Sequence, residues 1–105
     1  MTPILVYILC ADDAEAEKIG RAMVTARLAA CANIFPQGRS IYRWQDAIEE
    51  AQETALILKT RQDLFASLAQ QARALHSYET PCIIALPILT GTPDFLDWLA
   101  ANTRE

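Results

Sequence analysis

The chain has few of the residues on which common catalytic and cofactor motifs depend. It contains three glycines and one histidine among 105 residues, and neither a glycine-rich phosphate loop nor a GxSxG nucleophile motif occurs in it. Its paired acids are adjacent in sequence, at Asp12-Asp13 and Glu49-Glu50, which favours a helix start and a solvated strand flank over a catalytic pair. Because no nucleophile can be matched with a base, we expect no enzymatic activity.

Basic residues are also scarce. Nine Lys and Arg side chains stand against thirteen Asp and Glu, which leaves a formal net charge of −4. Binding to nucleic-acid phosphates depends on concentrated Lys and Arg. The charge balance therefore excludes DNA and RNA as expected partners.

Cysteine and long apolar runs are limited too. Cys10, Cys31 and Cys82 are an odd number of cysteines with no CxxC spacing, which argues against a secreted disulfide scaffold. The apolar run Ile4 to Cys10 has no basic residue before it, and it is far shorter than the roughly 20 residues of a membrane span. We expect a cytoplasmic protein with no membrane partner.

The sequence does contain the material for one packed domain over residues 1–105, because apolar residues make up 52% of the chain. Residue periodicity predicts strands over 4–10, 30–44, 48–60 and 82–89, and helices over 13–27 and 63–75, with a short helix after Thr92. Asp12 and Glu15 form an acidic capping box at the start of the first helix.

The predicted order is β-α-β-β-α-β with a short C-terminal helix. This is the ferredoxin-like split βαβ arrangement, an α+β fold in which two helices pack on one face of an antiparallel sheet. The strands are too apolar for the other face to stay bare, so either a second chain or the short third helix covers it. We expect a second chain.

The two middle strands predict a long hairpin. Pro36-Gln37-Gly38 marks a bulge or bend, and the segment from Gln45 to Ala47 turns the chain back. A two-stranded ribbon by itself is marginally stable in water. The projecting part is therefore expected to pair with another subunit.

The stretch LHSYETPCIIALPI, from Leu75 to Ile88, holds the single histidine. His76 ends the second predicted helix and Cys10 ends the first strand, and the split βαβ topology brings these two ends toward one edge. Thiolate and imidazole suit Cu(I), Zn(II) and similar ions, and Cys82, another subunit or water would complete the ligand set. The alternative is that the cysteines, Cys31 included, are small core residues.

Aromatic side chains predict a second candidate site. Tyr42, Trp44, Tyr78 and Trp98, with the polar residues Arg43, Lys59 and Glu79, are of the types that line a small-ligand cleft. In the alternative interpretation, Trp44 anchors a contact between subunits and Arg43 pairs with Glu79 across it, without any ligand.

The sequence resembles the CutA divalent-cation tolerance family in the stretches LAACANIFPQGRSIYRWQDAIEE, ALILKTR, HSYETPCIIALPI and DFLDWL. The resemblance extends over essentially the whole chain, and the combination of stretches is highly specific. It implies a ferredoxin-like subunit in a tight homotrimer whose hairpins pair between subunits. It also implies a cytoplasmic protein associated with tolerance to divalent metals, copper especially, with no established reaction and no organic cofactor.

For individual residues, the resemblance assigns copper or another divalent cation to Cys10 and His76. Some members carry a second histidine where this chain has Leu75, which leaves one ligand fewer. Cys82 replaces a glutamate of the common pattern and is a further soft ligand. The hairpin tip reads WQDAI where WEGKI is typical, so its usual glycine is missing.

The implied trimer is similar in architecture to the PII signal-transduction proteins, which bind small effectors between subunits. This similarity gives an alternative function, a signalling trimer that binds a small anion or nucleotide in clefts between subunits. The residues assigned to such a cleft are Arg43, Trp44, Lys59, Tyr78 and Glu79.

Overall fold

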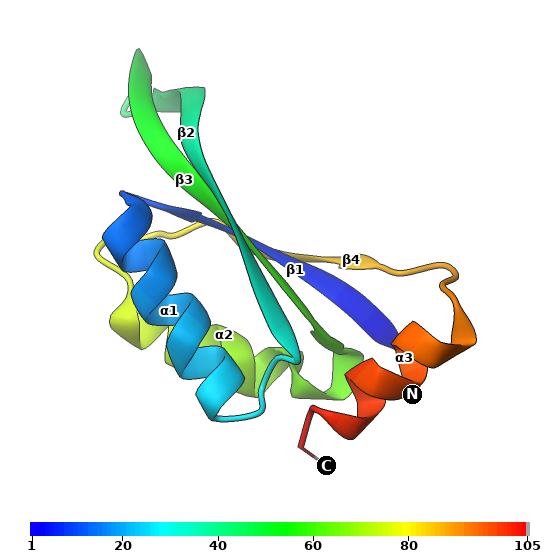
Figure 1. Ribbon diagram of the computed structural model, residues 1–105. Helices are drawn as coiled ribbons and strands as arrows, with labels where there is room; N and C mark the ends of the chain where they lie inside the picture. The colour runs from blue at the N-terminus through cyan, green and yellow to red at the C-terminus, as the bar shows by residue number, and fades with distance from the viewer. Residues whose placement is uncertain (105) are drawn as a thin grey trace.

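The computed structural model, described here for residues 1–104, contains one four-stranded antiparallel sheet and three α-helices (Figure 1). In chain order the elements are β1 (Pro3–Cys10), α1 (Asp13–Thr25), β2 (Cys31–Trp44), β3 (Ala47–Arg61), the 3₁₀ turn η1 (Gln62–Leu64), α2 (Phe65–Leu75), β4 (Ile83–Pro87) and α3 (Pro93–Ala101). The strand order β2-β3-β1-β4 confirms the predicted split βαβ topology. Over these residues, no helix combines the length and the apolar character needed to cross a membrane.

Helix α1 begins at the predicted cap and ends slightly before the predicted boundary. Asp12 is the N-cap, and its Oδ1 accepts the backbone N–H of Glu15 at 2.8 Å. The helix ends at Thr25 rather than at Arg27, because Arg27 adopts a φ of 60°. The N–H of Leu28 then donates back to the Met23 carbonyl at 3.0 Å, a left-handed helix ending that satisfies the last carbonyls.

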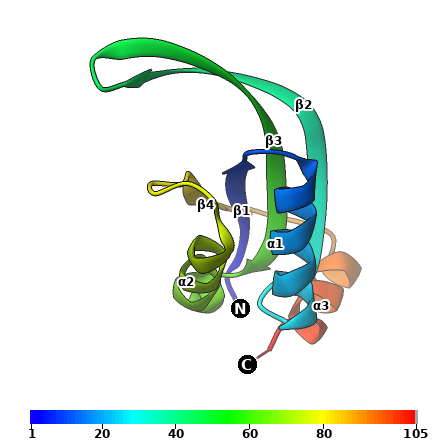
Figure 2. The ribbon, with the colours of Figure 1, turned by 90° about the vertical axis from the view of Figure 1, so that its left-hand side faces the viewer.

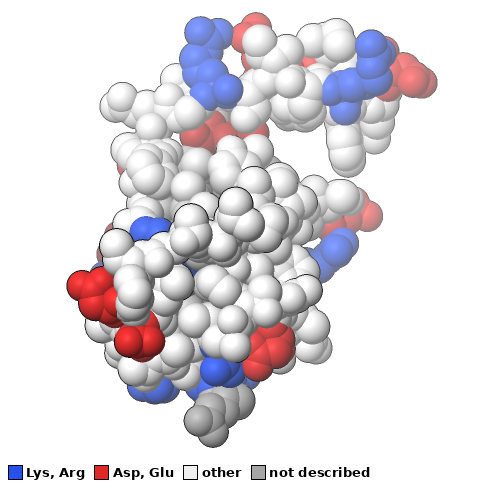
Figure 3. Space-filling model, turned by 90° about the vertical axis from the view of Figure 1, so that its right-hand side faces the viewer, with Lys and Arg blue, Asp and Glu red and all other residues white. Residues whose placement is uncertain are grey.

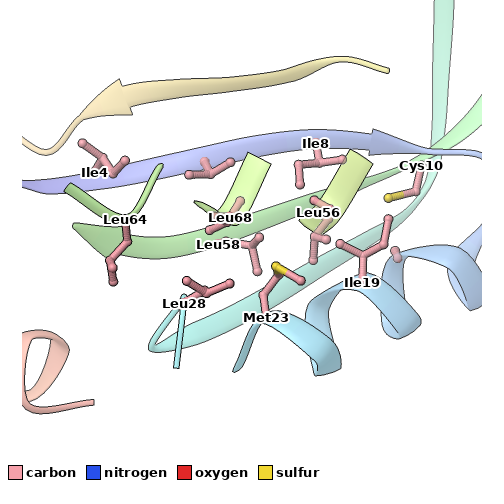
Figure 4. Close-up of a cluster of buried hydrophobic side chains, with 14 residues drawn as sticks. Ile4, Ile8, Cys10, Ile19, Met23, Leu28, Leu56, Leu58, Leu64 and Leu68 are labelled. Carbon is pink, nitrogen blue, oxygen red and sulfur yellow. The ribbon is translucent and has the colours of Figure 1, made fainter. Parts of the chain in front are cut away.

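The core lies between the sheet and the helices α1 and α2 (Figure 4). Alternate residues of β1 point toward the helices and are almost fully buried. The residues of the core that are drawn and labelled are Ile4, Ile8, Cys10, Ile19, Met23, Leu28, Leu56, Leu58, Leu64 and Leu68. Cys10 therefore lies at the end of the apolar core, next to the first turn of α1.

The opposite face of the sheet is incompletely covered within one chain. Helix α3 lies at one end of the sheet, near the start of β1 (Figure 1), and leaves Ile84 of β4 52% exposed and Leu86 47% exposed. Strand β4 is an edge strand and is shorter than the predicted run over residues 82–89. The sequence offered two covers for this face, the third helix or a second chain. Helix α3 leaves much of the face open.

Strands β2 and β3 continue past the sheet as a curved hairpin (Figures 1 and 2). A register shift between Phe35 and Gly38 confirms the predicted bulge at Pro36-Gln37-Gly38. The turn is formed by Gln45 and Asp46, with φ angles of 49° and 65°. Positive φ at both residues is the geometry of a two-residue hairpin turn that favours Asn and Gly, so this chain makes the turn without the glycine.

Candidate functional site

Three side chains of types that can ligate a metal meet where β1, α1 and α2 end or begin. Cys10 is the last residue of β1, Glu15 lies in the first turn of α1, and His76 directly follows α2. One ligand atom from each of the three lies within 4.8 Å of the other two. The topology therefore brings Cys10 and His76 together as the sequence predicted, and it adds a carboxylate.

The His76 ring is fully buried and hydrogen-bonded at both nitrogens. Its Nε2 lies 2.7 Å from the carbonyl oxygen of Leu9, and its Nδ1 lies 3.0 Å from the backbone nitrogen of Tyr78. Because the Tyr78 N–H donates to Nδ1, Nε2 carries the ring proton and donates to the carbonyl. A metal ion would have to take the Nδ1 lone pair from the Tyr78 N–H.

Glu15 connects the start of α1 to the segment that follows α2. Its Oε1 accepts the N–H of Ala11 at 2.9 Å, its Oε2 accepts the N–H of Ser77 at 2.9 Å, and Oε1 lies 3.6 Å from Nδ1 of His76. Burial by itself would raise the pKa of Glu15, but these hydrogen bonds lower it below its ordinary value, and a positive charge on His76 lowers it further when the ring is protonated. The carboxylate is therefore ionised and faces the histidine.

The thiol of Cys10 is protonated at neutral pH. Burial is the main cause, and the negative charges of Glu15, Asp12 and Glu53 add to it, so that the pKa of Cys10 is raised to about 12. A thiol in this state is a weak nucleophile. Metal ions bind the thiolate, so coordination at Cys10 would release one proton.

The structure places Cys82 differently from the other two predicted ligands. Cys82 is outside the group formed by Cys10, Glu15 and His76, and it lines a separate cleft. The sequence assigned Glu15 only to the helix cap. Its place in the cluster follows from the capping box that begins at Asp12, because the Glu15 side chain reaches back to the N–H of Ala11, the residue after Cys10.

The second candidate site is a cleft of about 510 Å³ between the β2–β3 hairpin and the segment that joins α2 to β4. Figure 3 shows the hairpin overhanging the rest of the molecule, with a hollow beneath it. The residues that line the cleft are Leu9, Ser40, Ile41, Tyr42, Trp44, Glu53, Tyr78, Glu79, Thr80 and Cys82.

A hydrogen bond between Tyr78 and Glu53 joins the two walls of this cleft. The Tyr78 hydroxyl donates to Oε2 of Glu53 at 3.0 Å. Burial, followed by the bond to Glu53 and the negative charges nearby, raises the pKa of Tyr78 to about 12. The hydroxyl is therefore a neutral donor at physiological pH.

Four of the residues predicted for a ligand cleft line this space, namely Tyr42, Trp44, Tyr78 and Glu79. Arg43 and Lys59, the two basic residues of that prediction, are not among the lining residues. Arg43 is an exposed residue of the hairpin, one position before the end of β2. Within one chain, the cleft thus lacks the cationic side chains that the sequence analysis assigned to it.

Lys59 and Trp98 lie in a different region, where α3 meets the sheet. The Lys59 ammonium donates to Oδ1 of Asn33 at 3.0 Å and lies 5.7 Å from the centre of the Phe95 ring. Trp98 packs beside Phe95, with ring centres 5.6 Å apart. Glu53, for which the sequence predicted no role, is the main addition to the cleft, and its only signal is an acidic residue just before an apolar strand segment.

Known proteins share both the sequence and the fold of this chain. The model of the CutA1 divalent ion tolerance protein family matches residues 4–102. The divalent-cation tolerance protein CutA of Archaeoglobus fulgidus is 46% identical over 94 residues, which cover 90% of this chain and 91% of that protein.

Two solved structures show how closely the fold agrees. The divalent cation tolerance protein of Thermus thermophilus superimposes with a TM-score of 0.95 at 44% identity, covering 97% of this chain and 99% of that one. CutA1 of Oryza sativa gives a TM-score of 0.97 at 35% identity, with coverage of 100% and 96%. With its sequence matched almost from end to end, the chain belongs to the CutA1 divalent ion tolerance family.

Proposed function

We propose that the protein is a metal-binding protein of the cellular response to divalent cations, copper in particular, and that Cys10, Glu15 and His76 hold the ion. The observation that carries this proposal is the convergence of their three ligand atoms within 4.8 Å. Thiolate, imidazole and carboxylate together suit copper and zinc. The name of the family and of its relatives, which refers to divalent ion tolerance, supports the same function.

The contacts of the three side chains indicate what binding would require. The Cys10 thiol must lose its proton, and His76 must exchange the Tyr78 N–H for the metal at Nδ1. Ligands at the bond lengths of a tetrahedral zinc or copper site are separated by about 3.3–3.8 Å, so the cluster must also contract. These costs predict weak binding that strengthens as the pH rises.

We also propose that the protein assembles as a homotrimer. Large apolar side chains are exposed along the hairpin and β4, including Phe35 at 52%, Ile48 at 63% and Ile84 at 52%. An exposed apolar surface of this kind is typical of a protein interface, and the free edge of β4 offers unpaired backbone groups. A second and third copy of the chain would cover both.

The cytoplasm is the proposed location. All three cysteines, Cys10, Cys31 and Cys82, are free thiols. Free thiols of this kind are kept reduced in the cytosol, whereas oxidising compartments favour disulfides. Reduced thiols are also the form that binds a soft metal.

The metal proposal is tested by anaerobic titration of the fully reduced protein with Cu(I) against a competing chelator, with Zn(II) in parallel. We expect one ion per chain in the unchanged protein, and at least about tenfold weaker binding in Cys10→Ser and in His76→Asn, since each loses one ligand. Asparagine keeps an acceptor near the position of Nδ1 for the Tyr78 N–H.

The matched control is Cys31→Ser, which removes a half-buried thiol outside the cluster. Its copper affinity should equal that of the unchanged protein. Equal binding by Cys10→Ser and the unchanged protein would refute the proposed site. Light scattering on the same samples tests the trimer, and a mass of one or two chains would refute that part.

A second candidate function is favoured by the cleft beneath the hairpin. A space of about 510 Å³ lined by aromatic and polar side chains is of the size and character of a small-molecule site. In this alternative the protein is a signalling trimer similar to the PII proteins, and it binds a small effector there. Effector binding would survive the loss of Cys10 and His76.

A further inference from the structure

We propose that the cleft between the hairpin and the α2–β4 segment binds a small organic cation, with an alkylated ammonium group held against Glu53 and the surrounding aromatic rings. This inference deepens the effector hypothesis, on which it rests, by giving the charge and chemical class of the ligand. It does not depend on the metal site.

The first observation is a buried carboxylate without a cationic partner. Glu53 is 8% exposed and lines the cleft. Within residues 1–104 its carboxylate receives one hydrogen bond, from the Tyr78 hydroxyl to Oε2, and it takes part in no ion pair. Oε1 receives no hydrogen bond and is open to the cleft, because Nε of Arg61 is the one side-chain N or O atom of the described residues that is both buried and without a partner. A cation in the cleft would pair with the carboxylate at Oε1.

The second observation is the set of aromatic rings that line the same cleft. Tyr42, Trp44 and Tyr78 all line the same cleft, and Tyr42 is close enough to Tyr78 to contribute to the raised pKa of its hydroxyl. Aromatic faces attract alkylated ammonium groups through the ring quadrupole. Trp44 lies beside the hairpin turn, opposite Ala47, and is 50% exposed within one chain.

The third observation is the sign of the charge in the cleft. Its two ionisable carboxyl groups belong to Glu53 and Glu79, and none of the ten residues that line it is Lys, Arg or His. An anionic ligand or a nucleotide phosphate would meet negative charge without a compensating base. Electrostatic complementarity therefore selects a cation over the anion that the sequence predicted.

The size of the cleft is compatible with this class of ligand. A volume of about 510 Å³ lies within the range of roughly 300–1,000 Å³ for small-molecule sites. An apolar wall formed by Leu9 and Ile41 lies beside the charged and aromatic groups. A ligand with one cationic head and a short apolar body would use both kinds of surface.

The test is calorimetric titration of the full-length protein with choline chloride and, separately, with 3,3-dimethyl-1-butanol, the neutral compound of the same shape. We expect choline to bind at least about tenfold more tightly than the alcohol, since only choline carries the charge that the rings and Glu53 attract. Equal affinity for the two compounds, or no binding of choline, would overturn the proposal.

Two variants locate the binding. Glu53→Gln keeps an acceptor for the Tyr78 hydroxyl but removes the charge, and Trp44→Leu removes a ring. Each should weaken choline binding about tenfold. The matched control is Glu17→Gln, which removes the same charge from an exposed position on α1, outside the cleft, and should leave choline affinity unchanged. Equal weakening by Glu17→Gln and Glu53→Gln would overturn the proposal.

A third probe separates this inference from the function on which it rests. If adenosine triphosphate binds in the cleft and choline does not, the effector hypothesis stands and the cationic ligand is refuted. A different result is that no small molecule binds and that Glu53→Gln weakens the assembly of chains in light scattering. Glu53 would then pair with a basic residue of a second copy, and both the cationic ligand and the effector hypothesis would be refuted. Choline binding in a Cys10→Ser/His76→Asn variant should equal that of the unchanged protein.

Discussion

Replacing Glu15 by glutamine should destabilise the fold by about 2 kcal/mol, because hydrogen bonds to a charged group contribute roughly 1.5–3 kcal/mol. Both carboxylate oxygens of Glu15 accept a backbone N–H at 2.9 Å, one from Ala11 and the other from Ser77. Its side chain is 12% exposed, so water replaces a lost acceptor poorly. Glutamine can keep one of these bonds, but its NH₂ group then faces the other N–H.

The pH dependence gives a second, independent readout of the same contact. The pKa of Glu15 is lowered from 4.5 in the folded protein, so the unfolded chain binds this proton more readily than the folded chain. Its contribution to stability is therefore fully present above about pH 4.5 and is lost as the pH falls through the folded pKa. The stability of Glu15→Gln should fall less steeply over this acidic range.

The assay is equilibrium unfolding by guanidinium from pH 3 to 7, at one protein concentration for all samples because the stability of an assembly depends on concentration. The matched control is Glu17→Gln, an exposed member of an ion pair with Arg21 on the same helix; it should change stability by less than about 1 kcal/mol. A Glu15→Gln protein as stable as the Glu17→Gln protein at pH 7, with the acid slope of the unchanged protein, would refute the reasoning.

Two further predictions concern the bulge and the metal cluster. Gly38→Ala places a Cβ 2.7 Å from the Glu53 carbonyl oxygen, so it should cost about 1–3 kcal/mol and reduce hydrogen-exchange protection along the hairpin. The control is Gly91→Ala, whose added Cβ meets only the movable Leu96 side chain and should reduce stability by less. An equal loss of stability in the two variants would contradict this explanation. Copper affinity should rise about tenfold per pH unit between pH 7 and 9, because one proton leaves Cys10 when the ion binds. Cys10→Ser should lack this pH dependence. The same pH dependence in Cys10→Ser would exclude the Cys10 thiol as a ligand.

The order and type of the elements could be predicted from the sequence, because their signals are local. The alternation over Ile4–Cys10, the capping box at Asp12 and Glu15, and the break at Pro36-Gln37-Gly38 each depend on residues within a few positions of one another. The end of α1 was less accurate. Arg27 carries no residue-type signal for a positive φ, since glycine usually fills that position.

The candidate sites could be predicted only in part. Cys10 and His76 were expected to meet because both lie at the ends of elements that the split βαβ topology brings together. Glu15 was not expected there, because its capping role accounted for it fully. Cys82 was assigned to the metal site and Lys59 to the ligand cleft by residue type alone. Each side chain lies elsewhere, because its direction depends on register and on bulges.

The sequence by itself determined the fold class, the long hairpin and the family, because hydrophobic periodicity, turn residues and whole-chain similarity are all properties of the linear order. Only the tertiary structure decided which chemical groups share a site. It showed that both nitrogens of His76 are engaged, that burial keeps the Cys10 thiol protonated, and that Glu53 lines a cleft together with aromatic residues. These properties arise from desolvation and from contacts between residues far apart in the chain, which no local pattern encodes.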